Sequence, residues 1–288
     1  MAIKRILCCI DGSGDTEPGL PTAMMLALAH DACVDVLHVQ LEPREALPVA
    51  ADGMTASLAD DIISGVEEEG QRRAARAEAA FRQAVADAGV ETIAPDSEVP
   101  SGAAASFRMK QGREANVIAA EGPLYDLIVL GRRHGEGEPP ASPTMEAAIM
   151  ETGRPVLVAP PTVPASLGRR PVVAWRATIP GVHALQGALP ILRQAGSVKV
   201  VTVDEAANRA LPGDVARYLA YHDVRAEAAS VSADGREAGQ AILEEAAGCD
   251  ADLLVMGAYA HGRLRQLVLG GVTSTVLRSA SLPLLLAH

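Results

Sequence analysis

The chain has 288 residues, and its 25 basic and 36 acidic side chains give a formal net charge of −11. This charge excludes a protein that binds nucleic acid mainly through a basic surface, and an aromatic content of 2% disfavours binding by base stacking. With 49% hydrophobic residues, the chain can fill the cores of one large or two ordinary domains, and those cores must be aliphatic.

Short apolar runs alternate with longer alanine-rich segments along the whole chain. The runs are continuously apolar and do not alternate with polar residues, which is typical of strands buried on both faces. The alanine-rich segments between them predict helices that cover the sheet. The predicted strands of the first half are 4–10, 34–40, 91–98, 125–131 and 155–160. Those of the second half are 171–175, 197–203, 224–230, 252–257 and 283–287. This order predicts a doubly wound, Rossmann-like α/β fold.

The segment 66–88 predicts one long amphipathic helix, because arginines and glutamates alternate with alanines at helical spacing. Its charged side chains are most simply the solvated face of that helix. The preceding residues 41–65 form a connection that is longer than its counterpart in the second half.

The second half of the chain repeats the first. Four segments recur in the same order: 18–19 as 180–181, 112–115 as 235–238, 125–131 as 251–257 and 155–159 as 283–287. This repetition indicates a tandem duplication, and the proline-rich residues 160–168 predict a linker. We expect two similar domains, 1–162 and 163–288, each with a five-stranded, mainly parallel sheet and helices on both faces. Their fifth strands, 155–160 and 283–287, should meet at the interface, since pairing there would bury two apolar edges.

The location of the protein is predicted from three features of the sequence. No apolar run approaches the roughly 18 residues of a membrane span, and the apolar stretch 6–10 is too short for a signal-peptide core. The cysteines lack a Cys-x-x-Cys spacing, which favours buried thiols over a metal or redox site. These cysteines are Cys8, Cys9, Cys33 and Cys249. We therefore expect a cytoplasmic protein that contacts neither membrane nor nucleic acid.

The segment that most suggests ligand binding follows the fourth strand of the second half. In an open parallel sheet, ligands bind outside the carboxyl ends of the strands, where the strand order reverses. Here Gly270 and Gly271 precede the hydroxyls of Thr273, Ser274 and Thr275 at a helix start. Backbone N–H groups and the helix dipole at such a place favour a phosphate. The alternative is that the glycines only permit a turn and Thr273 caps the helix.

The two predicted domains differ in charge. Residues 1–162 contain 13 basic and 25 acidic side chains, a net charge of −12, whereas residues 163–288 contain 12 and 11, a net charge of +1. A polyanion would meet less repulsion in the second domain. Arg176, Arg263 and Arg265 could contact an anion there or be solvated surface residues, and the imidazole of His261 is more simply a hydrogen-bonding group of the loop.

The tandem halves, the loop after the fourth strand and the Gly-Gly helix start resemble the universal stress protein family in its two-domain form, over essentially the whole chain. Nucleotide-binding members carry G-x2-G-x9-G followed by Ser or Thr, and here the pattern is Gly257, Ala260 and Gly270, then Gly271, with Thr273 at a further phosphate-contacting position. The resemblance implies a stress-response module that binds ATP or AMP, with Mg²⁺ accompanying ATP, in the second half. The implied contacts are Ala174, Trp175, Arg176, Val203, Met256, Gly257, Ala260, Gly270, Gly271, Val272 and Thr273.

The two halves depart from the family's pattern at different places. The acidic residue that ends the first strand in such members is kept as Asp11 in the first half and replaced by Arg176 in the second. Val39 and Gly131 match further family contacts, but the loop after Gly131 lacks the glycine and hydroxyl continuation and carries two glutamates that would repel a triphosphate. Asp11, Val39 and Gly131 are therefore the weaker candidates, and we expect Asp11 to be a helix cap or a loop hydrogen-bonding group.

Catalytic motifs are missing from the sequence. It contains no G-x-S-x-G, no H-E-x-x-H, no Walker A lysine and no Cys–His cluster. We therefore expect a binding module that takes an adenine nucleotide or a small anion and consists of an intramolecular pair of domains. The alternatives are a weak ATPase of the nucleotide alpha-hydrolase-like type and a nucleotide-independent scaffold, and association into a homodimer is also open.

Overall fold

The computed structural model describes residues 2–14, 18–43, 56–95, 97–132, 141–203, 211–233, 235–259 and 271–288. The elements of the first half are β1 (Arg5–Cys9), α1 (Gly19–His30), β2 (Cys33–Gln40), α2 (Ala56–Ala88), β3 (Glu91–Thr92), β4 (Ala104–Gln111), α3 (Glu114–Glu121), β5 (Leu127–Gly131), α4 (Pro143–Glu151) and β6 (Val156–Ala159). Those of the second half are β7 (Pro171–Ala174), α5 (Ile179–Leu192), β8 (Val198–Val203), α6 (Pro212–Ala220), β9 (Ala226–Val231), α7 (Ala238–Gly248), β10 (Leu253–Gly257), α8 (Gly271–Ser279) and β11 (Leu284–Ala287).

All eleven strands of the described residues form one sheet, in the order β3-β4-β2-β1-β5-β6-β11-β10-β7-β8-β9. Neighbouring strands are parallel within each half, as expected, but β6 and β11 pair antiparallel, with Leu285 opposite Leu157. The prediction that the fifth strands meet is confirmed. The predicted α/β fold with a mainly parallel sheet in each half is also confirmed, but the first half contributes six strands and not five, and the β6–β11 pairing makes the two sheets one.

The third predicted strand of the first half is misplaced. Within 91–98 only β3, two residues long, belongs to the sheet, and the strand that pairs with β2 along its whole length is β4. The pattern misses β4 because its second half is exposed and carries Arg108 and Lys110, so that its apolar run is short.

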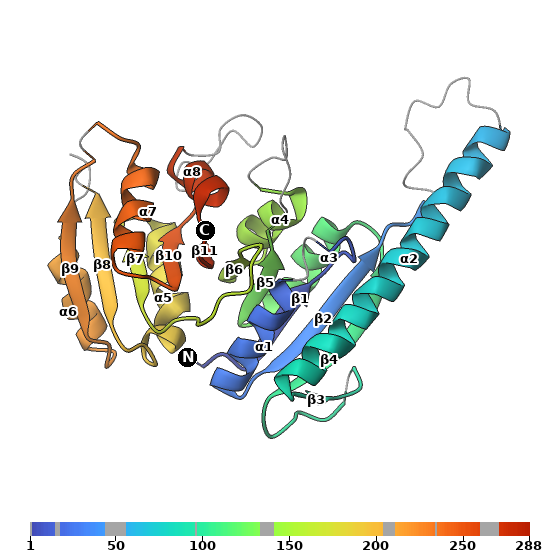
Figure 1. Ribbon diagram of the computed structural model, residues 1–288, viewed down its shortest axis with the longest axis horizontal. Coiled ribbons are helices and arrows are strands. Elements are labelled where there is room, and N and C mark those ends of the chain that lie inside the picture. Colours follow the sequence, from blue (N-terminus) through green and yellow to red (C-terminus); the bar gives the residue numbers. More distant parts are fainter. Residues whose placement is uncertain are drawn as a thin grey trace.

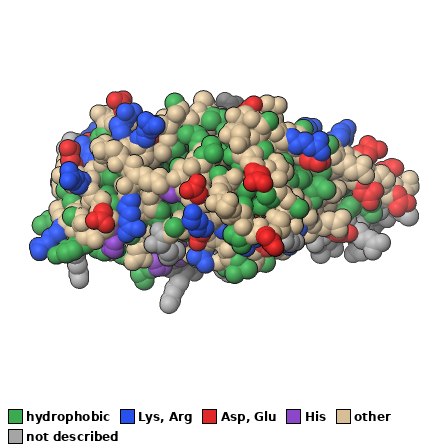
Figure 2. All heavy atoms as spheres, turned by 90° about the horizontal axis from the view of Figure 1, so that it is seen from below, with side chains coloured by type: hydrophobic (Ala, Val, Ile, Leu, Met, Phe, Trp, Pro, Cys, Tyr) green, Lys and Arg blue, Asp and Glu red, His purple; other side chains and the backbone are tan. Residues whose placement is uncertain are grey.

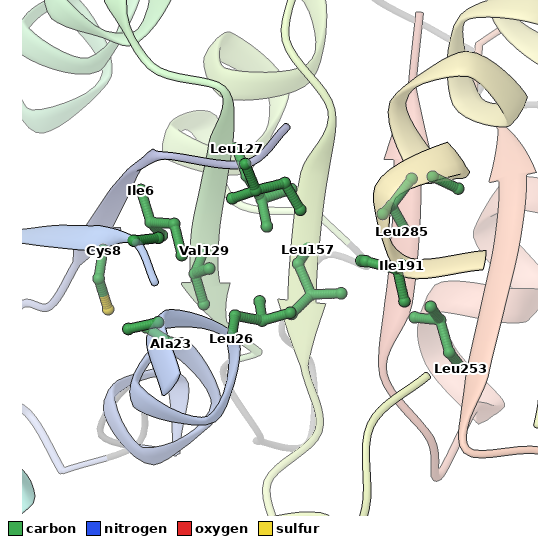
Figure 3. Close-up of a cluster of buried hydrophobic side chains, with 14 of the residues drawn as sticks. Ile6, Cys8, Ala23, Leu26, Leu127, Val129, Leu157, Ile191, Leu253 and Leu285 are labelled. Carbon is green, nitrogen blue, oxygen red and sulfur yellow. The ribbon is translucent and has the colours of Figure 1, made fainter. Parts of the chain in front are cut away.

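The helices cover both faces of the sheet (Figure 1). Buried side chains of α1, α2, α5 and α6 form one core layer, and those of α3, α4, α7 and α8 form the other. Each layer continues across the β6–β11 pair. Figure 3 shows this for the first layer, in which Leu26 and Leu157 of the first half lie near Ile191, Leu253 and Leu285 of the second.

Helix α2 is the largest difference between the halves. It has 33 residues and begins at Ala56, so part of the predicted connection 41–65 is helical. Its carboxyl-terminal part packs on the sheet, where Phe81 stacks on Phe107 with ring centroids 5.5 Å apart. Its amino-terminal part extends beyond the sheet (Figure 1), and acidic side chains gather at that end (Figure 2). Its counterpart α6 has nine residues.

All four cysteines are free thiols. Cys8 and Cys9 are buried as expected, and burial raises the pKa of Cys8 to about 12. Cys33 and Cys249 are only half-buried, because they lie at a strand start and a helix end. In the described part of the chain, no helix has the combined length and apolarity that a bilayer crossing demands.

Candidate functional site

The predicted site lies at the carboxyl ends of β7 and β10, which are neighbours in the sheet. The chain continues outward to β8 on one side and to β11 on the other, so the strand order reverses between them. Met256 is paired with Ala174, and the Trp175 N–H donates to the Val201 carbonyl oxygen (2.8 Å). The ends of three strands, with Val203 ending the third, therefore meet at one edge.

The side chains at this edge divide between the two faces of the sheet. Ala174 and Met256 belong to the core layer under α7 and α8, and Val203 and Val272 pack against that layer. Trp175 packs against the other layer, under α5 and α6. The structure thus brings four of the predicted contacts to the face of α8 and places the Trp175 ring on the opposite face.

Gly257 is needed for the packing of α5. A Cβ atom at this position would lie 2.5 Å from the Gly181 nitrogen and 2.6 Å from the Pro180 carbonyl carbon. The same contact occurs in the first half, where a Cβ at Gly19 would lie 3.1 Å from the Gly131 nitrogen. In each half, the repeated Pro-Gly pair at the helix start therefore packs against the glycine that ends β5 or β10.

Replacing Gly257 with alanine should lower the free energy of unfolding by about 1–3 kcal/mol, because the added methyl group meets backbone atoms that cannot rotate away. Urea unfolding measures this change. Gly248→Ala, at a helix position where a Cβ has nothing within 4 Å among the described atoms, should raise the free energy of unfolding by up to about 1 kcal/mol, because alanine loses less backbone entropy on folding. Equal midpoints for the two variants would contradict the packing role of Gly257.

The start of α8 is only partly available to a ligand. Gly271 is exposed, and a Cβ there would have no described atom within 4 Å, whereas Thr273 is 5% exposed. Thr275 Oγ1 donates to a carboxylate oxygen of Glu237 (2.7 Å). The predicted residues Ala260 and Gly270, together with His261, Arg263 and Arg265, lie outside the described residues.

The repeated Gly-Arg-Glu-Ala motif has a structural role in both halves. Glu237 accepts the hydrogen bond from Thr275 of α8, and Glu114 accepts one from Thr144 of α4 (2.8 Å). In each half the motif glutamate therefore fixes the last helix against the helix before it.

In the first half, α2 covers the loop after β1. A Cβ at Gly12 would lie 2.2 Å from the Arg73 carbonyl oxygen, and Arg76 Nε donates to the Gly12 carbonyl oxygen (2.8 Å). Asp11 is 8% exposed, and its Oδ1 accepts from the Ser13 N–H (3.0 Å) and Oγ–H (2.6 Å). Asp11 is thus a loop hydrogen-bonding group, and not the cap of α1, which is Pro18.

The other two first-half candidates, Val39 and Gly131, make packing contacts with different parts of the molecule. Val39 packs against the core layer under α3 and α4, and Gly131 lies at the contact with Gly19. The loop with the two glutamates, 133–140, lies outside the described residues. The described residues of this half therefore form a packed and hydrogen-bonded strand end.

Arg132, for which the sequence predicted no role beyond the loop, follows β5 and is 7% exposed. Its guanidinium donates to the carbonyl oxygens of Leu277 (2.9 Å) and Ala280 at the end of α8, and burial lowers its pKa. A cation at a helix carboxyl terminus is favourable. Arg132 thus joins the first half to the last helix of the second.

A buried polar cluster that was not predicted from the sequence lies under α3. Asp35 of β2 accepts hydrogen bonds from Ser106 Oγ (2.7 Å), Tyr125 OH (2.7 Å) and the Arg5 guanidinium (2.8 Å). Burial would raise the pKa of Asp35, but these hydrogen bonds outweigh it and hold the pKa below the ordinary value. The only sequence signal was one charged residue within the apolar run 33–37.

A comparison with protein families matches the model described as "Universal stress protein family" to residues 2–160 and 180–288. The chain belongs to the universal stress protein family. This universal stress protein carries two family domains in tandem, in agreement with the resemblance found in the sequence. A search of curated proteins found no match.

Solved structures give the same fold. A universal stress protein from Archaeoglobus fulgidus DSM 4304 is 17% identical, with a TM-score of 0.66, and the match covers 98% of this chain and 95% of that one. A putative universal stress protein from Pseudomonas aeruginosa UCBPP-PA14 is 17% identical, with a TM-score of 0.56, and the match covers 99% and 93%. A universal stress protein in complex with cAMP is 16% identical, and the match covers 56% of this chain and 100% of that one. Its TM-score is 0.31, so it supports no conclusion about this site.

Proposed function

We propose that this universal stress protein is a cytoplasmic stress-response module that binds ATP or AMP in its second domain, 163–288, while the first domain, 1–162, has a structural role. The observation that carries this proposal is the difference between the two strand ends. In the first half, α2 lies against Gly12 and Asp11 is hydrogen-bonded within its loop. In the second half, Ala177 after β7 is exposed, and so is the first residue of α8.

The chemistry of the second half suits an anion. The amino terminus of α8 presents backbone N–H groups and a partial positive charge, and Arg176 follows β7 at the same sheet edge. A guanidinium there offers only donors, which favours a phosphate over the ribose hydroxyls that a carboxylate would bind. Val203 and Met256 would contact the base, and Gly271, Val272 and Thr273 the phosphates, alongside the loop residues Ala260 and Gly270.

No group of three or more His, Cys, Asp or Glu side chains within the described ranges could hold a metal ion. Mg²⁺ is expected to accompany ATP. The competing function, a nucleotide-independent scaffold, is favoured by the use of Gly257 in packing and of Thr275 in the bond to Glu237. Titration of the full chain with ATP and AMP separates the two functions.

Gly271→Asp should weaken ATP binding by roughly ten- to a hundredfold, because it places a carboxylate where the N–H groups at the start of α8 converge. Isothermal titration calorimetry on the full chain measures the effect. Gly271→Ala is the matched control and should bind ATP within about twofold of the unmodified protein, since the position is open among the described atoms. Absence of ATP and AMP binding by the unmodified protein, or equal affinity of the aspartate variant, would leave the scaffold as the better description.

A further inference from the structure

Helix α8 is held at its carboxyl end by a side chain of the other half. The guanidinium of Arg132 donates to the Leu277 carbonyl oxygen (2.9 Å) and to that of Ala280. The last carbonyl groups of a helix have no partner within the helix, so Arg132 satisfies acceptors that α8 cannot satisfy itself. The opposite end of the same helix begins at Gly271, where the nucleotide phosphates are proposed to bind.

Helix α8 needs such support because it is short and makes few core contacts. It has nine residues, and its buried residues are Thr273, Val276 and Leu277. A helix of this length is not stable on its own in water. In the described part of the second half, Thr275 ties α8 to Glu237 before α7. Arg132 adds a tether from the first half, near the junction of the two halves (Figure 1).

This link between the halves runs in one direction. The Arg132 N–H donates to the Ala159 carbonyl oxygen (3.0 Å), and the Ala258 N–H donates to that of Ala287 (2.8 Å). Arg132 and Ala258 therefore occupy equivalent positions, each directly after the glycine that ends β5 or β10. An alanine side chain has no donor. At this position the first half therefore holds the last helix of the second half, and the second half gives no such support in return.

Arg132 acts on the proposed phosphate position through the order of α8 and only weakly through its charge. Nine helical residues span about 14 Å, which exceeds the Debye length of about 8 Å at physiological ionic strength. Short helices form and melt as a unit, because the first turn is costly to nucleate. Support at the carboxyl end therefore also keeps the first turn of α8 in place.

We propose that Arg132 is a positioning residue through which the first domain controls nucleotide affinity in the second. The inference rests on the proposed function, since it concerns the regulation of the same site. When Arg132 holds α8, the N–H groups at its start converge on a phosphate. Without that contact α8 is ordered for a smaller fraction of the time, and the apparent dissociation constant rises in inverse proportion to that fraction.

Arg132→Met tests the proposal in the full chain, because methionine fills similar space and has no donor. Hydrogen exchange through residues 271–279 should become about tenfold faster, as expected for the loss of hydrogen bonds from a charged donor. Calorimetry should show ATP binding that is weaker by about three- to tenfold. Arg132→Lys keeps a cation at the helix end but not the fork that reaches two carbonyl groups. It should bind ATP with an affinity between those of the unmodified protein and Arg132→Met.

Arg154→Met is the matched control. Arg154 Nε and one terminal nitrogen both donate to the Pro123 carbonyl oxygen (2.9 Å and 2.6 Å), so a guanidinium–carbonyl contact is again removed, but inside the first half. This variant should lower the urea midpoint. It should leave both ATP affinity and hydrogen exchange through 271–279 as they are in the unmodified protein.

Two results would overturn the proposal: ATP affinity that is unchanged in Arg132→Met, and equal losses of ATP affinity in Arg132→Met and Arg154→Met. If Arg132→Met does not fold, the lysine variant decides, and affinity equal to that of the unmodified protein counts against the proposal. If the unmodified protein binds neither ATP nor AMP, the proposed nucleotide function fails by itself. Exchange through 271–279 then decides alone: acceleration in Arg132→Met supports control of α8 by the first domain, and unchanged exchange overturns it.

Discussion

Leu285→Ala is expected to lower the free energy of unfolding by about 2–5 kcal/mol, and to do so for both halves of the molecule together. Leu285 is fully buried at the β6–β11 pair, opposite Leu157, in the core layer that Figure 3 shows crossing from one half to the other. Truncation leaves a cavity at the strand pair through which the two halves of the sheet are joined. Because the layer is continuous, unfolding should remain one cooperative transition.

Two signals followed during urea unfolding test this prediction. Far-UV circular dichroism reports on both halves, whereas tryptophan fluorescence reports only on the second, where the single tryptophan lies. Their midpoints should coincide in the unmodified protein and shift together in the variant. Leu211→Ala, at a leucine that is 68% exposed, should leave both midpoints in place. Separate transitions for the two signals would show that the halves unfold independently.

Asp35→Asn is expected to lower the free energy of unfolding by about 1.5–3 kcal/mol at pH 7, because it leaves the Arg5 guanidinium and the Tyr125 hydroxyl without their charged acceptor. The size of the effect follows from the burial of Asp35, which is 7% exposed. Glu78→Gln, which breaks an exposed ion pair with Arg82 on α2, should cost less than about 1 kcal/mol.

The effect of Asp35→Asn should depend on pH in a defined direction. The pKa of Asp35 is lower in the folded than in the unfolded chain, so its ionised form stabilises the fold above the unfolded pKa, about 3.9. That contribution is lost as the pH falls through the folded pKa. The difference between unmodified and variant protein should therefore be constant near neutral pH and shrink below about pH 4. A difference that grows on acidification would contradict the hydrogen-bonded carboxylate.

Sequence patterns located most of the sheet because its strands are buried on both faces. The predicted strands 34–40, 125–131 and 197–203 each overlap an observed strand almost completely. The pattern failed where a strand leaves the core, as in β4. It also failed at the start of α2, where Asp60 and Asp61 are exposed helical residues that resemble a loop in sequence.

The candidate site was harder to predict, since one residue type serves two purposes. A glycine at a strand end can admit a phosphate or a neighbouring helix, and Gly257 admits α5. The repeat distinguishes these two roles. A Pro-Gly pair and a strand-end glycine occur in both halves, and the first half lacks the phosphate loop, so the shared glycines indicate helix packing. Arg132 gave no such signal, because its partners are carbonyl oxygens nearly 150 positions away.

Because β6 and β11 belong to one chain, the two halves stay paired while their sequences diverge. Their association is intramolecular, so dilution does not separate them as it separates two independent subunits. In a symmetric homodimer, every substitution appears on both sides of the interface. Here each half can accumulate its own substitutions while the β6–β11 pairing is retained. A 33-residue α2 and a nine-residue α6 can therefore occupy equivalent places in one molecule, which leaves one copy free to acquire a ligand that the other cannot bind.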